Sequence, residues 1–351
     1  MGAASDSSAR SRRRRGRQVT ARTSARPPPD LKWTPCRPRR SIVVAYARSD
    51  ARRSCATCAS GWRRPGAAPG SSCLSRVRPG AARPPWFFHQ SAFTASLEHT
   101  RTALALYDRD RHRTVASLYG KNAGVTCHAW AAQALCLLGE EDAGVQRIEE
   151  ALVLAERLEH PYSVASARSQ AACVYQYRQQ PEQALHWAEA TVVLAADQGF
   201  GYRVATGTIL RGWALTRLGR HQEGLAELRR GLAAYQETGA QMERPYYLAL
   251  LAEALGEAGQ PADGLTAIDE GLALIPPGRS FFYEAELHRL RGSLLQADDH
   301  ADARHQAEAH VVRAFKVARC QQAHLLERRA AESLATIRQR RGTDLSNRGH
   351  S

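Results

Sequence analysis

The chain has 351 residues and carries 49 lysines and arginines against 34 acidic residues, which gives a formal net charge of +15. This length allows two ordinary domains or one long repeat array, and the charge alone would suggest a nucleic-acid or anionic-membrane partner. No stretch approaches 18 consecutive apolar residues and no secretory signal is recognisable, so the sequence argues against a membrane-spanning helix.

The excess positive charge lies in the first segment of the chain. Residues 1–90 contain 20 lysines and arginines but three acidic residues, whereas residues 91–351 contain 29 and 31 respectively. The first segment is rich in Arg, Pro, Ser, Ala and Gly, and its few apolar residues follow no sustained period. Such a composition buries too little apolar surface to offset the entropy of ordering, so we expect a disordered basic leader over residues 1–90.

Several functions could be attached to this leader. Its arginines could hold phosphates through counterion release, which makes nonspecific nucleic-acid binding the alternative function of the chain. A twin-arginine signal would need an apolar stretch that does not follow, and a transit peptide fits the remaining sequence poorly. Cys55-x-x-Cys58 could ligate zinc together with Cys36 and Cys73, although only one close pair exists. The plainest interpretation is an unstructured leader, or sequence translated upstream of the true start.

From residue 143 onward, the sequence repeats with a period of forty residues. Corresponding ten-residue segments begin at Ala143, Gln183, Glu223 and Asp263. In the first of these segments, Gly144, Ile148 and Ala151 have spacings of four and three, which place them on one helix face. The other segments have small residues at the positions of Gly144 and Ala151 and mostly larger residues at the position of Ile148. We interpret each segment as the second helix of a pair.

A first helix precedes each of these segments. In the first unit it carries the small residue Ala132, followed three positions later by Leu135. The junctions between the helices contain Gly or Pro, as at Gly139 and Pro181, which suit a left-handed helix end and a first helical turn respectively. Glycines that recur inside the second helices, such as Gly224, cost stability unless neighbouring helices approach closely there.

These signals predict an all-α fold of helical hairpins stacked into a superhelix, because one such pair cannot bury its apolar face alone. We expect the array to cover residues 91–341, with about four intact units, a looser fifth and a half-unit at each end. Residues 91–107 would be a second helix without its first, residues 321–339 a first helix without its second, and residues 342–351 a disordered tail. Ends of this kind could expose apolar edges, so the chain could also be a fragment without independent activity.

The positions exemplified by Ala132, Leu135 and Gly144 resemble the consensus of the tetratricopeptide repeat family, although the period of that family is about 34 residues. Several segments are also similar to the C-terminal region of bacterial adenylate/guanylate cyclase and ATPase fusion proteins. They begin at Leu118, Thr208, Arg244 and Tyr283. This resemblance implies a regulatory module of a bacterial signalling ATPase or cyclase-type regulator. Its partner would be a protein, with ATPase or cyclase domains among the candidates.

The catalytic part of those fusion proteins is not recognisable here. No Gly-x-x-x-x-Gly-Lys-Ser/Thr phosphate loop occurs, and no Asp-bearing motif can be assigned to a cyclase metal site. His300, His305 and His310 are spaced by five, so they do not share one helix face as metal ligands would. The four cysteines beyond the leader lie among apolar residues, as reduced cysteines do. We therefore expect a cytoplasmic, non-enzymatic protein-binding module without cofactor or metal, for which nucleic acid and membranes are less favoured partners.

In the tetratricopeptide family the first helices of successive pairs line a concave face, and the resemblance carries this arrangement over to seven positions. The candidate partner-binding residues are Gln133, Gln176, Tyr177, Trp213, Arg217, Glu253 and Arg289. Aromatic and arginine side chains are common anchors of protein interfaces. Trp213 could equally be a core residue between helices, and Arg217 and Arg289 could be solvated charges. Trp130 and Trp187 fit the core better than an interface.

Overall fold

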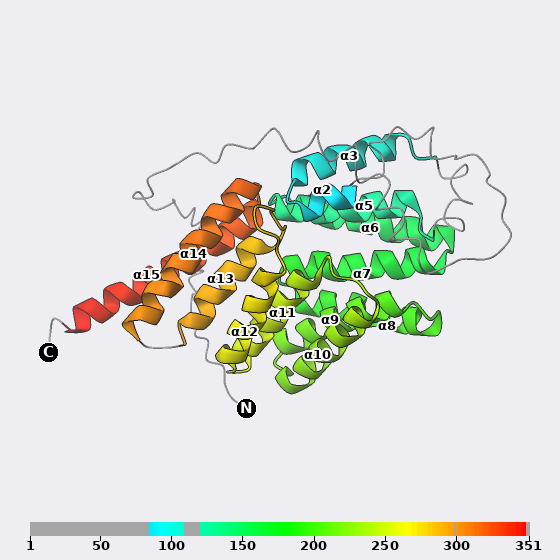
Figure 1. Ribbon diagram of the computed structural model, residues 1–351. Coiled ribbons are helices and arrows are strands. Elements are labelled where there is room, and N and C mark those ends of the chain that lie inside the picture. The colour runs from blue at the N-terminus through cyan, green and yellow to red at the C-terminus, as the bar shows by residue number, and fades with distance from the viewer. Residues whose placement is uncertain (1–83, 109–119, 298–299, 349–351) are drawn as a thin grey trace, which may run out of the picture. The chain divides into compact units, whose positions relative to one another are not determined.

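The computed structural model describes residues 84–108, 120–297 and 300–348, all of which belong to one compact unit, and every regular element within these ranges is an α-helix (Figure 1). Side chains are described throughout these ranges except at residues 301 and 341–348. Most of the predicted basic leader, with its cysteines and its arginine run, lies outside the described residues. The predicted insertion near Asp298 also falls partly outside them.

The described helices alternate between first and second members of hairpins. The first helices are α5 (Ala123–Leu137), α7 (Pro161–Tyr177), α9 (Gly201–Arg217), α11 (Arg244–Glu257), α13 (Glu284–Leu295) and α15 (His324–Arg348). The second helices are α6 (Glu141–Leu158), α8 (Pro181–Asp197), α10 (His221–Glu237), α12 (Pro261–Ala273) and α14 (Ala301–Gln321). Each of these second helices packs against the first helix that precedes it, so the predicted all-α array of helical hairpins is confirmed.

The ends of the array differ from the sequence-based expectation. Helix α3 (Phe93–Ala105) is the expected unpaired second helix and packs on α5, but a short helix α2 (Pro84–His89) precedes it within the predicted leader. Phe88 of α2 is completely buried, with its ring 5.0 Å from that of Trp130 and 4.8 Å from that of Phe282. This aromatic burial explains why residues 84–89 form a helix within the predicted leader. At the other end, α15 continues through residues 342–348, which were expected to be a tail.

Local sequence signals set the helix boundaries. The Asn122 side chain accepts a hydrogen bond from the backbone N–H of Val125 and so caps α5, as Asn residues often do at this position. Pro161 and Pro181 open α7 and α8, where the missing proline N–H costs nothing. Gly139 and Gly219 follow two of the first helices with φ angles of +89° and +83°, a conformation that favours glycine.

The glycines inside the helices allow α9 and α10 to approach closely. A Cβ atom at Gly212 would lie 2.7 Å from the carbonyl oxygen of Gly224, and one at Gly224 would lie 2.6 Å from that of Gly212. Both distances are far below van der Waals contact with backbone atoms that cannot move independently. The predicted close approach of neighbouring helices is therefore confirmed at this pair.

Replacing Gly224 by alanine is expected to lower the free energy of unfolding by about 1–3 kcal/mol, because the added methyl group must push two helix backbones apart. This should happen although alanine is the better helix former by about 1 kcal/mol. Urea denaturation followed by far-ultraviolet circular dichroism would measure the change. Gly201→Ala is the matched control, because a Cβ there meets no atom within 4 Å. Equal stability of the two variants would contradict the role of close helix approach.

Hydrogen bonds between polar side chains join the neighbouring first helices α7 and α9, and the bonded residues lie nearly one repeat apart in the sequence. Ser169 and Thr206 share a hydrogen bond of 3.2 Å, and Arg203 donates to Ser166 over 2.8 Å. Both pairs are 37 residues apart in sequence and are buried. This polar contact between α7 and α9 supplements the apolar packing of successive hairpins.

Helix α15 contacts the beginning of the array as well as its neighbour α14. Arg328 of α15 forms an ion pair with Glu141 at the start of α6, 187 residues away, and α15 also contacts α5. Apolar residues of α15, among them Leu334 and Ile337, are buried against α14. Large exposed apolar side chains are found in several described helices, but α15 has none within its described side chains. The expected apolar edge is therefore not seen there.

Candidate partner-binding pocket

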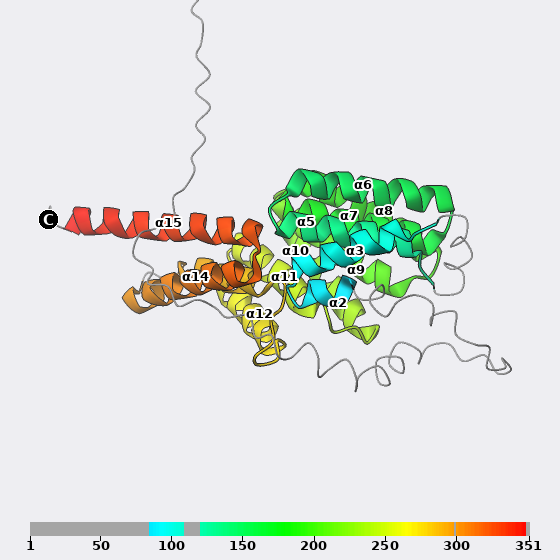
Figure 2. The ribbon, with the colours of Figure 1, turned by 90° about the horizontal axis from the view of Figure 1, so that it is seen from above.

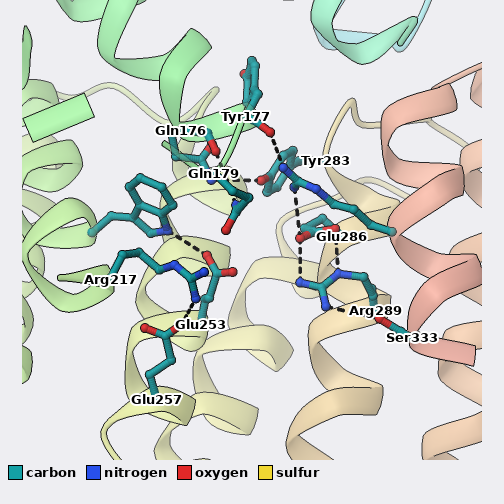
Figure 3. A network of polar contacts seen from close by, with 12 residues as sticks. Gln176, Tyr177, Gln179, Arg217, Glu253, Glu257, Tyr283, Glu286, Arg289 and Ser333 are labelled. Atoms are coloured by element: carbon teal, nitrogen blue, oxygen red, sulfur yellow. Dashed lines mark hydrogen bonds and ion pairs between the residues drawn. The ribbon is translucent and has the colours of Figure 1, made fainter. Parts of the chain in front are cut away.

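A cavity of about 470 Å³ opens to solvent where the ends of several first helices meet α15. Its lining comes from α7, α9, α11, α13 and α15, together with Glu141 of α6. Figure 3 shows the central part of this lining. The lining residues are Glu141, Tyr177, Arg178, Gln179, Arg217, Glu253, Glu286, Arg289, Leu325, Arg328, Arg329, Glu332, Ser333 and Thr336. Charged residues dominate this set, so the cavity is a polar site rather than an apolar groove.

One wall of the pocket is built around Glu286 of α13, whose relative exposure is 2%. Arg289 donates to both oxygens of this carboxylate, from Nε over 3.0 Å and from Nη2 over 2.8 Å. Arg329 of α15 contacts the same carboxylate over 3.4 Å and also donates to the backbone carbonyl of Tyr177. Burial alone would raise the pKa of Glu286, but the charges of Arg289 and Arg329 outweigh it and hold this pKa below its ordinary value.

The opposite wall comes from α9 and α11. Trp213 donates its indole N–H to Oε2 of Glu253 over 2.7 Å, and Arg217 forms an ion pair with Glu257. Both pairs join residues forty positions apart, so equivalent positions of adjacent repeats face each other. Burial raises the pKa of Glu253 above its ordinary value, and the nearby Arg289 opposes this shift. Figure 3 shows these two walls on opposite sides of the pocket.

Four of the seven predicted site residues line this one pocket. They are Tyr177, Arg217, Glu253 and Arg289. The side chains of Arg217 and Arg289 retain exposures of 33% and 15% and are both engaged in ion pairs, so neither is a freely solvated charge. Partner binding by these residues remains a prediction. The structure shows that they line the same cavity, with Tyr177 itself 1% exposed.

The other three predicted residues lie in the interior. Trp213 has no exposed surface, Gln176 has none, and Gln133 retains 3%. Tyr177 donates its hydroxyl hydrogen to Gln133 over 3.0 Å, and Gln176 accepts from Tyr246 over 2.9 Å. These side chains are already satisfied by internal hydrogen bonds. A partner would meet the pocket-lining residues first, while these three support them from behind.

Sequence reasoning did not identify Glu286, Arg329 and Ser333. Glu286 and Arg289 are three residues apart on α13, a spacing that brings side chains together on one helix face and could have indicated the pair. Arg329 and Ser333 lie on α15, which contacts α13. No repeat-based rule places the end of the array against the carbonyl of Tyr177. That contact depends on the sum of the small rotations between successive hairpins along the array.

In the part of the chain that the structure describes, the other reactive side chains do not gather into a second site. Cys127, Cys136 and Cys173 are free and buried, and burial raises the pKa of Cys127 to about 11, so this thiol stays protonated. Within the described ranges, no three histidine, cysteine or acidic side chains gather so as to hold a metal ion. Of the helices that the structure describes, none combines the length and apolar character that a bilayer crossing requires. Trp130 belongs to the core, as predicted, and Trp187 packs against it half-buried.

Comparison of the sequence with known proteins finds one curated relative with a partial match. No model of a known protein family matches the chain. An uncharacterised protein from Rhizobium meliloti (strain 1021) is 27% identical over 239 residues, which cover 68% of this chain and 23% of that protein. The chain therefore spans less than a quarter of the length of that relative.

Several solved structures of helical-repeat proteins share part of the arrangement. A Rap protein complexed with competence and sporulation factor has a TM-score of 0.44 and 14% identity, covering 73% of this chain and 62% of that one. A tetratricopeptide repeat protein from Parabacteroides merdae has a TM-score of 0.42 and 15% identity, with coverages of 72% and 86%. A signal transduction ATPase with a tetratricopeptide repeat sensor, from Pyrococcus horikoshii, has a TM-score of 0.42 and 11% identity, with coverages of 75% and 38%. The likeness is limited to the helical-repeat architecture and identifies no ligand or partner of this chain.

Proposed function

We propose that the hairpin array is a protein-interaction module and that its partner docks over the mouth of the polar pocket. The observation that carries this proposal is the gathering of charged side chains from four first helices, α9, α11, α13 and α15, around one open cavity. Arg217, Arg328 and Glu332 lie at this surface with substantial exposure. Arginine pairs readily with carboxylates and stacks on aromatic rings, so such a rim suits a protein segment that carries acidic and aromatic side chains.

The pocket chemistry favours binding over covalent catalysis. Among its described lining residues there is no cysteine or histidine, and the Ser333 hydroxyl lies beside Arg289 rather than beside a general base. A nucleophilic hydroxyl needs an adjacent base to be activated at neutral pH. The lining therefore supports recognition of charge and shape.

We further propose that the array serves within, or together with, a larger bacterial signalling protein of the ATPase or cyclase class. The resemblance of its repeats to the C-terminal region of such fusion proteins supports this. The Rhizobium meliloti relative is also more than four times as long as the segment that matches this chain. In this arrangement the array would bind the catalytic portion or a regulator of it.

Charge reversal at the pocket rim tests the docking surface. We expect this chain to bind the portion of the Rhizobium meliloti relative outside the matched segment, measured by isothermal titration calorimetry. Arg217→Glu should weaken this binding at least tenfold, because it replaces an attractive contact by a repulsive one. ATPase and cyclase assays of the same portion, with and without this chain, would show whether binding alters catalysis.

Two controls separate a lost contact from a disturbed fold. Arg229→Glu changes the same charge on the exposed face of α10, outside the pocket, and should leave binding unchanged. Combining Arg217→Glu with Glu257→Arg restores the ion pair with its two charges exchanged, so position 217 stays negative and binding should stay weak. Recovery of binding in the combined variant, or no binding by the unmodified chain, would argue against this docking surface.

A further inference from the structure

The wall of the pocket around Glu286 carries one unbalanced positive charge. Arg289 and Arg329 both contact the single carboxylate of Glu286, and neither forms a direct ion pair with another acidic residue among those described, although Glu253 attracts both from across the pocket. Both side chains are mostly buried, with exposures of 15% and 12%. Arg289 also donates to the Ser333 hydroxyl over 3.4 Å. Two guanidinium groups share one carboxylate, so N–H donors remain for a second anionic group.

The facing wall carries one unbalanced negative charge. Oε2 of Glu253 accepts the Trp213 indole N–H, whereas Oε1 has no hydrogen-bond donor within the described part of the chain. Arg217 of the same wall is engaged with Glu257. Glu253 is partly buried, and burial raises its pKa although Arg289 across the pocket opposes the shift, so the ionised carboxylate retains a desolvation cost. A cationic group at Oε1 would relieve that cost.

The remaining charges of the pocket are balanced or exposed. Arg328 pairs with Glu141, and Arg178 pairs with Asp142 over 3.0 Å. Glu332 is exposed, so water screens its charge. The inner pocket therefore has two walls of opposite residual charge, separated by a solvent-accessible space of about 470 Å³. This volume lies within the range of small-molecule sites.

We propose that this pocket binds a small zwitterion, a free amino acid or a short peptide, with its ammonium group on Glu253 and its carboxylate on Arg289 and Arg329. Such a ligand compensates both walls at once, and each contact would be a charge-assisted hydrogen bond. Ser333 supplies a neutral polar group beside the carboxylate end. The inference goes beyond docking of a protein because it needs no macromolecular partner.

Binding of small probes to the full chain tests this proposal directly. The twenty free L-amino acids and dialanine would be screened by equilibrium dialysis, and the tightest binder would be compared with its N-acetyl and C-terminal amide derivatives. The zwitterion should bind at least tenfold more tightly than either derivative, because each derivative lacks one of the two charges. Trp213 donates to Glu253, so ligand binding should also change tryptophan fluorescence, and Trp213→Phe should remove that change.

Two variants assign the charges to the walls. Glu253→Gln keeps the shape of the side chain and its acceptor for Trp213, but it should weaken the zwitterion at least tenfold, to about the affinity of the N-acetyl derivative, which does not use Glu253. Glu223→Gln removes an exposed carboxylate of α10 outside the pocket and should leave binding unchanged. The proposal is overturned if no probe binds, if singly charged derivatives bind as tightly as the zwitterion, or if Glu253→Gln binds as tightly as the unmodified chain.

Discussion

Replacing Glu286 by glutamine is expected to lower the free energy of unfolding by about 3–5 kcal/mol, the usual cost of removing one partner of a buried ion pair. The substitution would leave the guanidinium groups of Arg289 and Arg329 together in a mostly buried wall without a countercharge. Glutamine keeps the size of the side chain, so the loss would be electrostatic rather than a packing defect. Thermal and urea denaturation would measure it.

The surface pair between Arg217 and Glu257 provides the comparison. Its side chains are 33% and 26% exposed, and exposed pairs contribute about 0–1 kcal/mol. Glu257→Gln should therefore change stability by less than 1 kcal/mol. Adding Arg329→Met to Glu286→Gln should recover part of the loss, because one of the two uncompensated charges is then gone. A Glu286→Gln variant as stable as Glu257→Gln would show that the buried triad contributes no net stability.

Acidification is expected to destabilise the fold through the contact between α13 and α14. His288 of α13 is 5% exposed, and its Nδ1 lies 3.4 Å from Nδ1 of His310 in α14. Burial lowers the pKa of His288 to about 4, and the charges of Arg313, His310 and Arg291 act in the same direction. Burial and the charge of Arg291 also lower the pKa of His310, whereas the charge of Asp269 raises it.

The sign of the effect follows from proton binding. In the unfolded chain His288 takes up a proton below about pH 6.5, whereas in the folded chain it resists protonation until about pH 4. Unfolding therefore binds a proton between these values, and stability falls as the pH decreases through this window. The contribution of His288 amounts to a loss of about 2 kcal/mol at pH 5 relative to pH 7.5.

Comparison with His288→Asn isolates this contribution, because asparagine can hydrogen-bond near the position of Nδ1 and does not titrate. Urea denaturation at several pH values between 7.5 and 5 should show a shallower decline for the variant than for the unmodified chain. His89 and His128 also have lowered pKa values, so the variant should keep part of the decline. Parallel curves for the two proteins would contradict a role for His288.

The repeat pattern predicted the fold because its determinants are local. The spacing of Gly144, Ile148 and Ala151 indicates one helix face. The close approach of two helices at Gly212 and Gly224 explains why glycine recurs at these positions. Helix ends followed from glycine and proline at the junctions. Each of these signals acts within one hairpin or between adjacent hairpins, so a single sequence contains it.

The pocket was predictable in part. Groove-facing offsets carried over from the resemblance located Arg217, Glu253 and Arg289, one residue on each of three helices that line the pocket. They also selected Trp213 and Gln176, which are buried because adjacent helices and internal hydrogen bonds cover them. Repeat position specifies the side of a helix but not how much space remains in front of it.

Helix α2 was not predicted because it is held by tertiary contacts and not by a periodic pattern. It lies beside α3 and α5 (Figure 2). Its Phe88 packs on Trp130 of α5 and on Phe282, and His89 lies 3.9 Å from Glu243. A six-residue helix is too short to show a helical period in the sequence. Its aromatic residues indicate a buried helix only when the distant residues that they contact are known. The same applies to the contact of α15 with α6.

The ion pair between Arg328 and Glu141 changes how the array should respond to thermal fluctuation. In an open solenoid each hairpin interacts with its nearest neighbours, so terminal repeats fray independently and cooperativity decays along the chain. Here the last helix also interacts with the first complete hairpin, so fraying at one terminus removes a contact from the other. The two termini are thereby energetically coupled, and a disturbance at either end is communicated directly without passing through each intervening repeat.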